Sequence, residues 1–235
     1  MEKKNASVLF LGKASDAYVE KALQFCQRNF KEVTAYLGSW GDPIPESAEW
    51  WNGELIISYL SRWVVPDFLL KRSKIAAINF HPASPNYPGI GCNNFALYED
   101  TKGYGVTCHH MASAVDTGNI IAVKRFPIFS TDNVASLLAR TYDYQLVLFY
   151  EIMNYILSGQ ELPVSQEQWT RKAFSRKEFN KLGEITLEMD SEEIERRIRA
   201  TAFNDWGPII EIFGYVFEFT NKGQKKLTRG FNAGR

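Results

Sequence analysis

The feature that most restricts the fold of this 235-residue chain is an alternation of strand-like and helix-like segments in its first third. Strand-like runs occupy residues 8–11, 32–37, 55–60 and 75–80, and the last of these has the length and content of a strand buried on both faces. Between the first two runs, residues 14–28 carry apolar side chains at helical spacing. Parallel neighbouring strands need crossover connections. The alternation therefore predicts an α/β fold with a mostly parallel, Rossmann-like sheet.

The later residues predict a long helix followed by smaller elements. Capping residues precede a helical pattern at residues 134–157, and a serine and a glycine close it. Residues 163–180 are polar and aromatic with few periodic positions, and they begin a carboxyl-terminal extension. A short basic helix at residues 191–201 and strands within residues 207–219 follow. These elements predict a small mixed α+β extension at the carboxyl end.

Candidate chemical groups gather where one predicted strand ends. Asn79 and His81 are two residues apart, so their side chains leave the same face of an extended chain. Pro82 cannot donate to a sheet ladder and should end the strand there. Ligands of open α/β sheets bind beyond the carboxyl ends of strands. Asp116, 35 residues after the histidine, follows a second strand-like run and can reach His81 if the two runs are neighbours.

An amide, an imidazole and a carboxylate together suit acyl transfer to nitrogen. A neutral imidazole can accept a proton from an attacking amine. A carboxylate orients the imidazole and stabilises the imidazolium that forms. A carboxamide N–H can donate to the oxyanion of a tetrahedral intermediate. No side-chain nucleophile is needed. A purely structural interpretation stays open from spacing alone, because His-Pro turns and Asp-x-Gly loops are common.

Three blocks of sequence resemble a known enzyme family. Residues 79–89, 105–111 and 115–121 are similar, in the same order, to formyltransferases that use 10-formyltetrahydrofolate. This family includes the methionyl-tRNA, glycinamide ribonucleotide and sugar-nucleotide enzymes. The likeness extends over residues 8–128 as a fold and is sharp over residues 79–121. Several linked blocks are far more specific than one short motif.

The resemblance implies transfer of a formyl group from 10-formyltetrahydrofolate to a primary amine. The catalytic residues of the family fall on Asn79, His81 and Asp116, as oxyanion donor, general base and orienting partner. The family holds its pterin largely through the backbone of two segments, which here are Trp63, Val64 and Val65, and Ala112, Ser113, Ala114, Val115 and Asp116. Without the resemblance, the first of these segments would be interpreted as core. No metal is expected.

The carboxyl-terminal residues favour a sugar-nucleotide acceptor. Residues 196–203 resemble the region that follows the catalytic domain in sugar-nucleotide formyltransferases, and the loop at residues 88–95 resembles enzymes that act on dTDP-linked amino-deoxy sugars. Ile90 stands where the related aminoarabinose enzyme has an arginine, which argues against a UDP-aminopentose. We therefore expect a formyltransferase catalytic domain over residues 1–160 and an extension over residues 161–235.

The predicted acceptor is dTDP-4-amino-4,6-dideoxyglucose or its 3-amino isomer, in the synthesis of a bacterial surface polysaccharide such as the O-antigen of lipopolysaccharide. Candidate acceptor contacts are Tyr87, Gly89 and Asn94. The basic candidates for the diphosphate cannot be ranked and are Lys13, Arg62 and Lys124. His109 and His110 alternate on their strand, so one of them should point toward the sheet interior near Asp116. We expect a structural role for either histidine. A glycinamide ribonucleotide formyltransferase and a folate-binding protein without turnover remain alternatives.

Composition restricts the partners and the compartment. Lys and Arg together number 27, as do Asp and Glu, so the net charge is +0, which argues against a nucleic-acid partner. Three cysteines, Cys26, Cys92 and Cys108, have no paired spacing and indicate reduced thiols in the cytoplasm. The amino terminus has no long apolar run, so we expect no membrane span. The family resemblance and an aromatic hairpin at residues 215–219 predict a homodimer.

Overall fold

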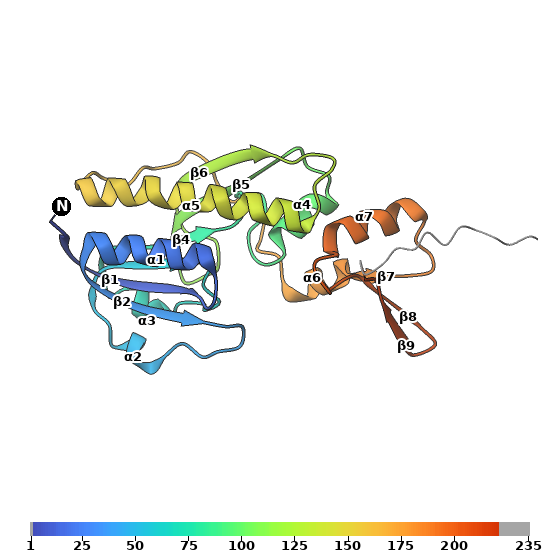
Figure 1. Cartoon of the computed structure of the whole chain (residues 1–235), viewed down its shortest axis with the longest axis horizontal. Helices are drawn as coiled ribbons and strands as arrows, with labels where there is room; N and C mark the ends of the chain where they lie inside the picture. Colours follow the sequence, from blue (N-terminus) through green and yellow to red (C-terminus); the bar gives the residue numbers. More distant parts are fainter. Residues whose placement is uncertain (1, 221–235) are drawn as a thin grey trace, which may run out of the picture.

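The computed structural model describes residues 2–220, and its main sheet follows from the alternation in the sequence (Figure 1). The strands of this sheet are β1 (Lys4–Lys13), β2 (Phe30–Gly38), β3 (Gly53–Tyr59), β4 (Ser73–His81), β5 (Gly103–His110) and β6 (Ile120–Pro127). Their order is β2-β1-β3-β4-β5-β6. The pairs among β1, β2, β3 and β4 are parallel, whereas β5 is antiparallel to both β4 and β6. The predicted α/β fold with a mostly parallel sheet is confirmed.

Helices connect these strands and continue into the carboxyl-terminal part. They are α1 (Ala17–Asn29), α2 (Glu46–Glu49), α3 (Asp67–Leu70), α4 (Cys92–Tyr98), α5 (Val134–Ser158), α6 (Arg176–Leu182) and α7 (Ser191–Thr201). Among residues 2–220, no helix has both the length and the hydropathy needed to cross a lipid bilayer.

Alternating side chains divide the sheet between two hydrophobic cores. In β1, Val8 and Phe10 belong to the larger core, whereas Leu9 and Leu11 belong to the smaller one on the other face. The larger core receives the buried faces of α1 and α5, and the smaller one receives Leu69 of α3. Covering both faces explains why the strands are continuous apolar runs in the sequence.

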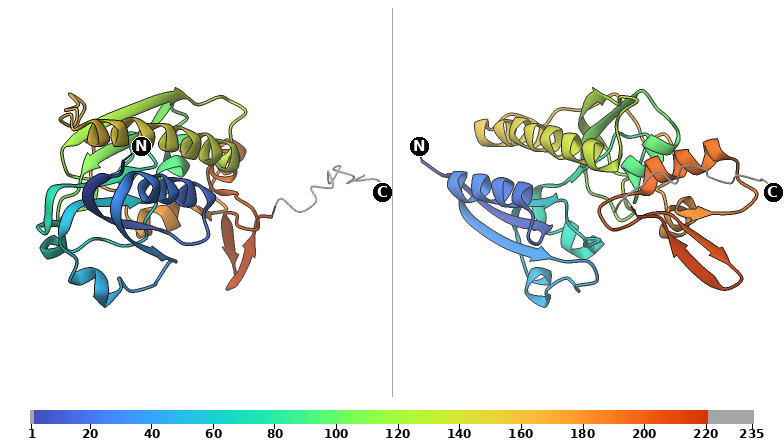
Figure 2. Two further views of the ribbon diagram at one scale, coloured as in Figure 1. Left: turned by 60° about the vertical axis from the view of Figure 1, so that its left-hand side comes forward. Right: turned by 45° about the vertical axis from the view of Figure 1, so that its right-hand side comes forward.

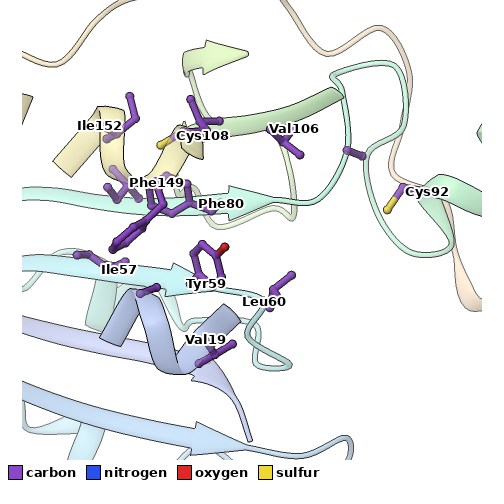
Figure 3. Packing of buried hydrophobic residues seen from close by; sticks show 14 of the residues in the cluster. Val19, Ile57, Tyr59, Leu60, Phe80, Cys92, Val106, Cys108, Phe149 and Ile152 are labelled. Carbon is purple, nitrogen blue, oxygen red and sulfur yellow. The ribbon is translucent and has the colours of Figure 1, made fainter. Parts of the chain in front are cut away.

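Three aromatic rings fix α5 on the larger core. Phe149 of α5 lies 5.4 Å from Tyr59 and 5.2 Å from Phe80, centroid to centroid, and Tyr59 lies 5.8 Å from Phe80 (Figure 3). Tyr59 and Phe80 are at the carboxyl ends of β3 and β4, which are neighbours. The rings therefore hold in place the two strand ends from which the candidate site is built.

Helix boundaries differ from the sequence expectations in three places. The first helix begins at Ala17 instead of residue 14, because the Asp16 side chain caps it by accepting from the amides of Tyr18 and Val19. The expected loop at residues 88–95 turns into α4 at Cys92, directly after Gly91 at φ 66°. Residues 163–180, which show few periodic positions in the sequence, include the start of α6.

The carboxyl-terminal residues form a second, smaller sheet. It consists of β7 (Glu184–Ile185), β8 (Ile209–Ile212) and β9 (Tyr215–Glu218), the last two as an antiparallel hairpin. The hairpin extends away from the body of the molecule in every view (Figures 1 and 2), and Phe213 at its tip is 98% exposed. A domain boundary at residue 160 stays a prediction, and residues 221–235 of the predicted extension lie outside the described residues.

Residues 163–175, here called the return segment, run back from the end of α5 along the main sheet. The amide of Ser165 donates to the carbonyl of Ile120, and the amide of Thr170 donates to that of Pro85. Phe174 pairs with the loop after β4 through a bridge to Gly89. Gly89 has φ +90°, and a Cβ there would lie 2.5 Å from the Phe174 backbone, so this position requires glycine. The return segment thereby fixes the loop that follows β4.

Candidate active site

Asn79 and His81 lie at the carboxyl end of β4, on the wall of a cavity of about 510 Å³. Ile78 and Phe80 belong to the larger core, so Asn79 and His81 leave the opposite face of the strand. His81 is the last residue of β4, and Pro82 directly follows it. The shared face that the sequence predicts for the two side chains is observed.

Asp116 approaches His81 from the connection between β5 and β6. Its Oδ2 lies 3.4 Å from Nδ1 of His81, and its Oδ1 lies 3.3 Å from Nε2 of His109. The amide of Gly89 donates to Oδ2 at 2.8 Å. The three side chains are between 2% and 7% exposed. The structure thus brings the three predicted catalytic residues together and adds His109 to them.

The pKa of Asp116 shows which of its neighbours dominate. Burial acts to raise the pKa of this carboxyl, but the charge of His81, the hydrogen bond and charge of His109 and the Gly89 amide outweigh burial and lower the pKa to about 2. Asp116 is therefore a carboxylate at neutral pH. It can orient an imidazole and stabilise its positive charge.

Both ring nitrogens of His81 lie near an oxygen atom. Nδ1 faces Asp116, and Nε2 is 2.9 Å from the carbonyl oxygen of Tyr87. A neutral imidazole can donate to only one of them. The other nitrogen keeps a lone pair, and this nitrogen can act as a base toward an amine that enters the cavity.

His109 connects Asn79 to Asp116. Nε2 of His109 lies 3.1 Å from Nδ2 of Asn79, in addition to its contact with Asp116. Its Nδ1 lies 2.8 Å from the carbonyl oxygen of His110, to which an N–H at this position donates. The alternation of β5 indicated that one of these two histidines points inward but could not tell which. His109 therefore contacts two of the three predicted catalytic residues, Asn79 and Asp116, in addition to the structural role that we expected from the sequence.

Trp169 of the return segment closes one side of this group. Its ring centroid lies 5.8 Å from that of His81 and 5.0 Å from that of His109, both edge to face. Its Nε1–H donates to the carbonyl of Gly118 at 2.9 Å. Sequence analysis missed Trp169, because it is an isolated aromatic in a segment without periodicity. Trp169 is more than fifty residues away from both histidines in the sequence, and the fold brings it into contact with them.

The two segments expected to hold the pterin both border the cavity. Trp63, Val64 and Val65 line it directly after β3, and the Trp63 indole N–H donates to the carbonyl of Asp42. From the second segment, Ala112, Ala114, Val115 and Asp116 line it, whereas Ser113 does not. Apolar side chains with few polar groups fit a flat heterocycle such as a pterin. Their role in folate binding stays a prediction.

The acceptor candidates occupy different positions. Gly89 and Asn94 line the cavity, but Nδ2 of Asn94 donates to the carbonyl of Ala200 in α7 at 2.7 Å. The Tyr87 side chain is buried, donates its hydroxyl to Glu99 and is absent from the cavity wall formed by residues 2–220. Tyr87 contributes its carbonyl oxygen, next to His81.

The structure also ranks the basic candidates for the diphosphate. Lys13 lines the cavity and forms an ion pair with Asp16 at 2.9 Å. Lys124 pairs with Glu151 at 2.8 Å and does not contribute to the part of the cavity wall that residues 2–220 form. Arg62 lines the cavity. Of the three, Arg62 is the candidate that reaches the cavity with no such carboxylate partner among the described residues.

A family model described as formyl transferase matches residues 46–152. The chain contains a formyl transferase domain. The matched residues include Asn79, His81 and Asp116, so the candidate active site lies within this formyl transferase domain. The match confirms the family that the sequence blocks resemble.

Curated relatives and solved structures agree with this assignment. A methionyl-tRNA formyltransferase from Levilactobacillus brevis is 26% identical over 148 residues, which are 63% of this chain and 47% of the relative. The chain spans about half the length of the curated relatives that it matches. A sugar N-formyltransferase from a Shewanella species superimposes with a TM-score of 0.73 at 17% identity, covering 91% of this chain and 96% of that chain.

A second solved structure contains ligands. It is an N-formyltransferase from Helicobacter canadensis in complex with folinic acid and dTDP-3-aminofucose. Its TM-score is 0.67 at 23% identity, with 83% of this chain and 80% of that chain covered. Both structures show that the formyl transferase domain and the residues after it share the fold of these enzymes.

Proposed function

We propose that this protein is an enzyme that transfers a formyl group from 10-formyltetrahydrofolate to the primary amine of a nucleotide-linked amino sugar. The proposed acceptor is dTDP-4-amino-4,6-dideoxyglucose or its 3-amino isomer. The observation that carries the proposal is the meeting of Asn79, His81 and Asp116 on the wall of one cavity. Each supplies a group that formyl transfer to an amine requires.

The contacts of these residues suggest a role for each. The folate supplies the formyl group, and the acceptor amine attacks its carbonyl carbon. His81 takes the proton that the amine loses, and the Asp116 carboxylate stabilises the resulting imidazolium. The Asn79 amide donates to the oxygen that becomes negative. When the bond from the formyl carbon to the folate nitrogen breaks, His81 returns its proton to that nitrogen.

Two of the solved structures with this fold favour a sugar-nucleotide acceptor. One is the sugar N-formyltransferase from the Shewanella species. The Helicobacter enzyme combines a folate and a dTDP-linked amino sugar in one structure. The net charge of +0 gives no basic excess for a nucleic-acid backbone.

The amino terminus of α1 argues against the glycinamide ribonucleotide alternative. A helix amino terminus at the carboxyl edge of a sheet is a ready site for a small phosphate. Here the Asp16 carboxylate already accepts from the amides of Tyr18 and Val19 and pairs with Lys13. A phosphate bound there would compete with a carboxylate. The other alternative, a folate-binding protein without turnover, is weakened by the assembled catalytic group.

We further propose that the protein acts in the cytoplasm as a homodimer, in the synthesis of a bacterial surface polysaccharide. Cys26, Cys92 and Cys108 are all buried and unbridged, as in a reducing compartment. The β8–β9 hairpin exposes Tyr215 and Phe217 far from the main core, a surface suited to a second copy of the chain. A monomeric mass by light scattering at assay concentration would contradict the dimer.

The test of the proposed function is a panel of acceptors. The purified protein is incubated with 10-formyltetrahydrofolate and, separately, with dTDP-4-amino-4,6-dideoxyglucose, its 3-amino isomer, a GDP-aminosugar, UDP-aminoarabinose and glycinamide ribonucleotide. Formylated product is identified by mass spectrometry. We expect product from one of the dTDP sugars. Product from glycinamide ribonucleotide alone would move the protein to purine synthesis, and folate binding without any product would favour a binding protein.

A further inference from the structure

The cavity is more basic than the chain as a whole. The chain has equal numbers of basic and acidic residues. On the part of the cavity wall that residues 2–220 form, three basic side chains, Lys13, Arg62 and Arg176, accompany one carboxylate, Asp116. Lys13 is paired with Asp16, and Asp116 with two histidines. The two arginines therefore leave an excess of positive charge at the cavity.

These two arginines are exceptional within the described residues. Nearly every other arginine of residues 2–220 has a carboxylate partner or, in the case of Arg72, a backbone carbonyl. Those with neither kind of partner in that range are Arg28, Arg62 and Arg176. Two of these three line the one cavity that contains the catalytic group. Unpaired surface arginines scattered at random would not be expected to gather there.

Aromatic contacts position Arg176 at the cavity. Its guanidinium lies 4.8 Å from the ring centroid of Trp40 and 5.5 Å from that of Phe179. Phe179 packs on Gly91 so closely that a Cβ there would lie 2.3 Å from the ring. Gly91 is two residues before Asn93 in the same wall. Arg176, Phe179 and the start of α4 therefore form one continuous surface.

Asn93 adds an unsatisfied polar group to this surface. Asn93 is 8% exposed and lines the cavity, yet its Nδ2 is buried and has no hydrogen-bond partner among residues 2–220. A buried amide without a partner is costly, and native structures retain few of them. The neighbouring Asn94 is satisfied by the carbonyl of Ala200. The orphaned amide of Asn93 indicates that the cavity is built for a polar ligand atom at this point.

We propose that Arg62, Arg176 and Asn93 form an anion-binding subsite in the wall of the cavity, which holds a diphosphate. The proposal rests on the proposed function for the identity of the acceptor, but it concerns binding alone. Guanidinium groups match oxyanions with forked hydrogen bonds, and the side-chain amide of Asn93 donates to an adjacent oxygen of the ligand. The carboxylate tail of the folate is a second anion that the same arginines could bind. The experiment therefore has to distinguish diphosphate binding from binding of the folate carboxylates.

The experiment measures binding by calorimetry, without turnover. The probes are dTDP, inorganic pyrophosphate and folinic acid, and the variants are Arg62→Gln, Arg176→Gln and Asn93→Leu. Each arginine variant should bind dTDP and pyrophosphate with an affinity lower by about tenfold or more, because a charge-assisted hydrogen bond is lost. Folinic acid affinity should stay within about twofold. The loss should shrink as salt is added.

Two controls keep the result specific. Arg28→Gln removes an exposed arginine outside this cavity and should leave all three affinities unchanged. Asn93→Leu should weaken dTDP without lowering the melting temperature, because no hydrogen bond within the described protein is lost. A lower melting temperature with unchanged dTDP affinity would show a structural role and overturn the assignment of Asn93.

The outcomes also separate this subsite from the proposed function. Unchanged dTDP and pyrophosphate affinities in both arginine variants would overturn the subsite. Weakened folinic acid with unchanged dTDP would assign the arginines to the folate tail and overturn it as well. Weakened dTDP and pyrophosphate would support it even if the acceptor panel yielded no formylated product, since binding and transfer are measured independently.

Discussion

Two connections of the main sheet, before and after β6, each carry a buried aspartate with a lowered pKa. Asp116 precedes β6, and Asp132 follows it. Hydrogen bonds from Arg140, and to a lesser extent from the Phe129 amide and Ser136, lower the pKa of Asp132 to about 2 against the effect of burial. The pKa of Asp116 is lowered to about 2 as well. A lowered pKa by itself therefore does not separate a catalytic carboxylate from a structural one.

The partners of the two aspartates make the difference. Asp132 pairs with Arg140, which stays charged at any useful pH, and its backbone carbonyl also accepts from Arg199. It is a fixed link between the chain before α5 and later elements. Asp116 lies between the imidazole rings of His81 and His109, and it borders the cavity. Imidazole partners and access to the cavity are therefore the features on which we base the proposed catalytic role of Asp116.

The largest expected effect contrasts these two residues directly. Asp116→Asn should lower kcat by about 1,000-fold or more, by analogy with other orienting aspartates of catalytic histidines. Asp132→Asn should leave kcat within about threefold, because it touches neither cavity nor histidine. Initial rates of formylation at saturating folate measure both. Similar losses of kcat in the two variants would contradict the different roles that we assign to Asp116 and Asp132.

A smaller effect tests whether the loop that presents Asp116 tolerates expansion. A Cβ on Gly118 would lie 1.8 Å from the carbonyl oxygen of His110. Gly118→Ala should therefore lower the free energy of unfolding by about 1–3 kcal/mol and displace Asp116. Gly103→Ala is the matched control, since no heavy atom of the described part of the chain lies within 4 Å of its added Cβ. Urea unfolding of both variants measures the effect. Equal free energies of unfolding for the two variants would show that the loop has room for a side chain at Gly118.

Asp132→Asn should act on stability instead of turnover. Losing the charge-assisted bonds to Arg140 should cost about 2 kcal/mol at pH 7. Because the folded pKa is depressed from 3.8 to about 2, the stabilisation is full above pH 4 and is lost as the pH falls toward 2. The difference in the free energy of unfolding between wild type and variant should therefore decrease toward zero as the pH falls from 4 to 2. Urea unfolding at pH 7, 4 and 3 measures it, and a constant difference would argue against this origin.

The sequence predicts the centre of the site because local signals fix it. The apolar run before Asn79 and the proline after His81 place both side chains at a strand end, and the resemblance adds Asp116. Strand alternation is also sufficient to assign the two faces of β1 and β3 to different cores. These features depend on residues close together in the chain.

Other parts of the site depend on contacts that no local pattern contains. Trp169 reaches the histidines only because the return segment crosses the sheet, and Arg176 reaches the cavity through the placement of α6. One local signal was present but unused: Ser175 and Glu178 form a capping box at the start of α6. It could have predicted the helix, although not its position against the cavity.

The smallest expected effect concerns Trp169. Trp169→Phe keeps an aromatic ring beside both histidines but loses the hydrogen bond to the carbonyl of Gly118. One neutral hydrogen bond is worth about 1 kcal/mol, so the rate should fall by about fivefold. The rate of the Trp169→Leu variant should fall further, and the pH profile of its kcat should shift, because this substitution also exposes the histidines. An unchanged profile in both variants would limit Trp169 to packing.

The central claim is that the histidine at the end of β4 is the base for formyl transfer. Single-turnover formation of the formylated sugar nucleotide by wild type and His81→Ala, with folinic acid binding measured in parallel, tests it most directly. We expect product formation by His81→Ala to fall by about 1,000-fold while its folinic acid affinity stays within about twofold of wild type. Substantial product formation by the variant would contradict the assignment of His81 as the base.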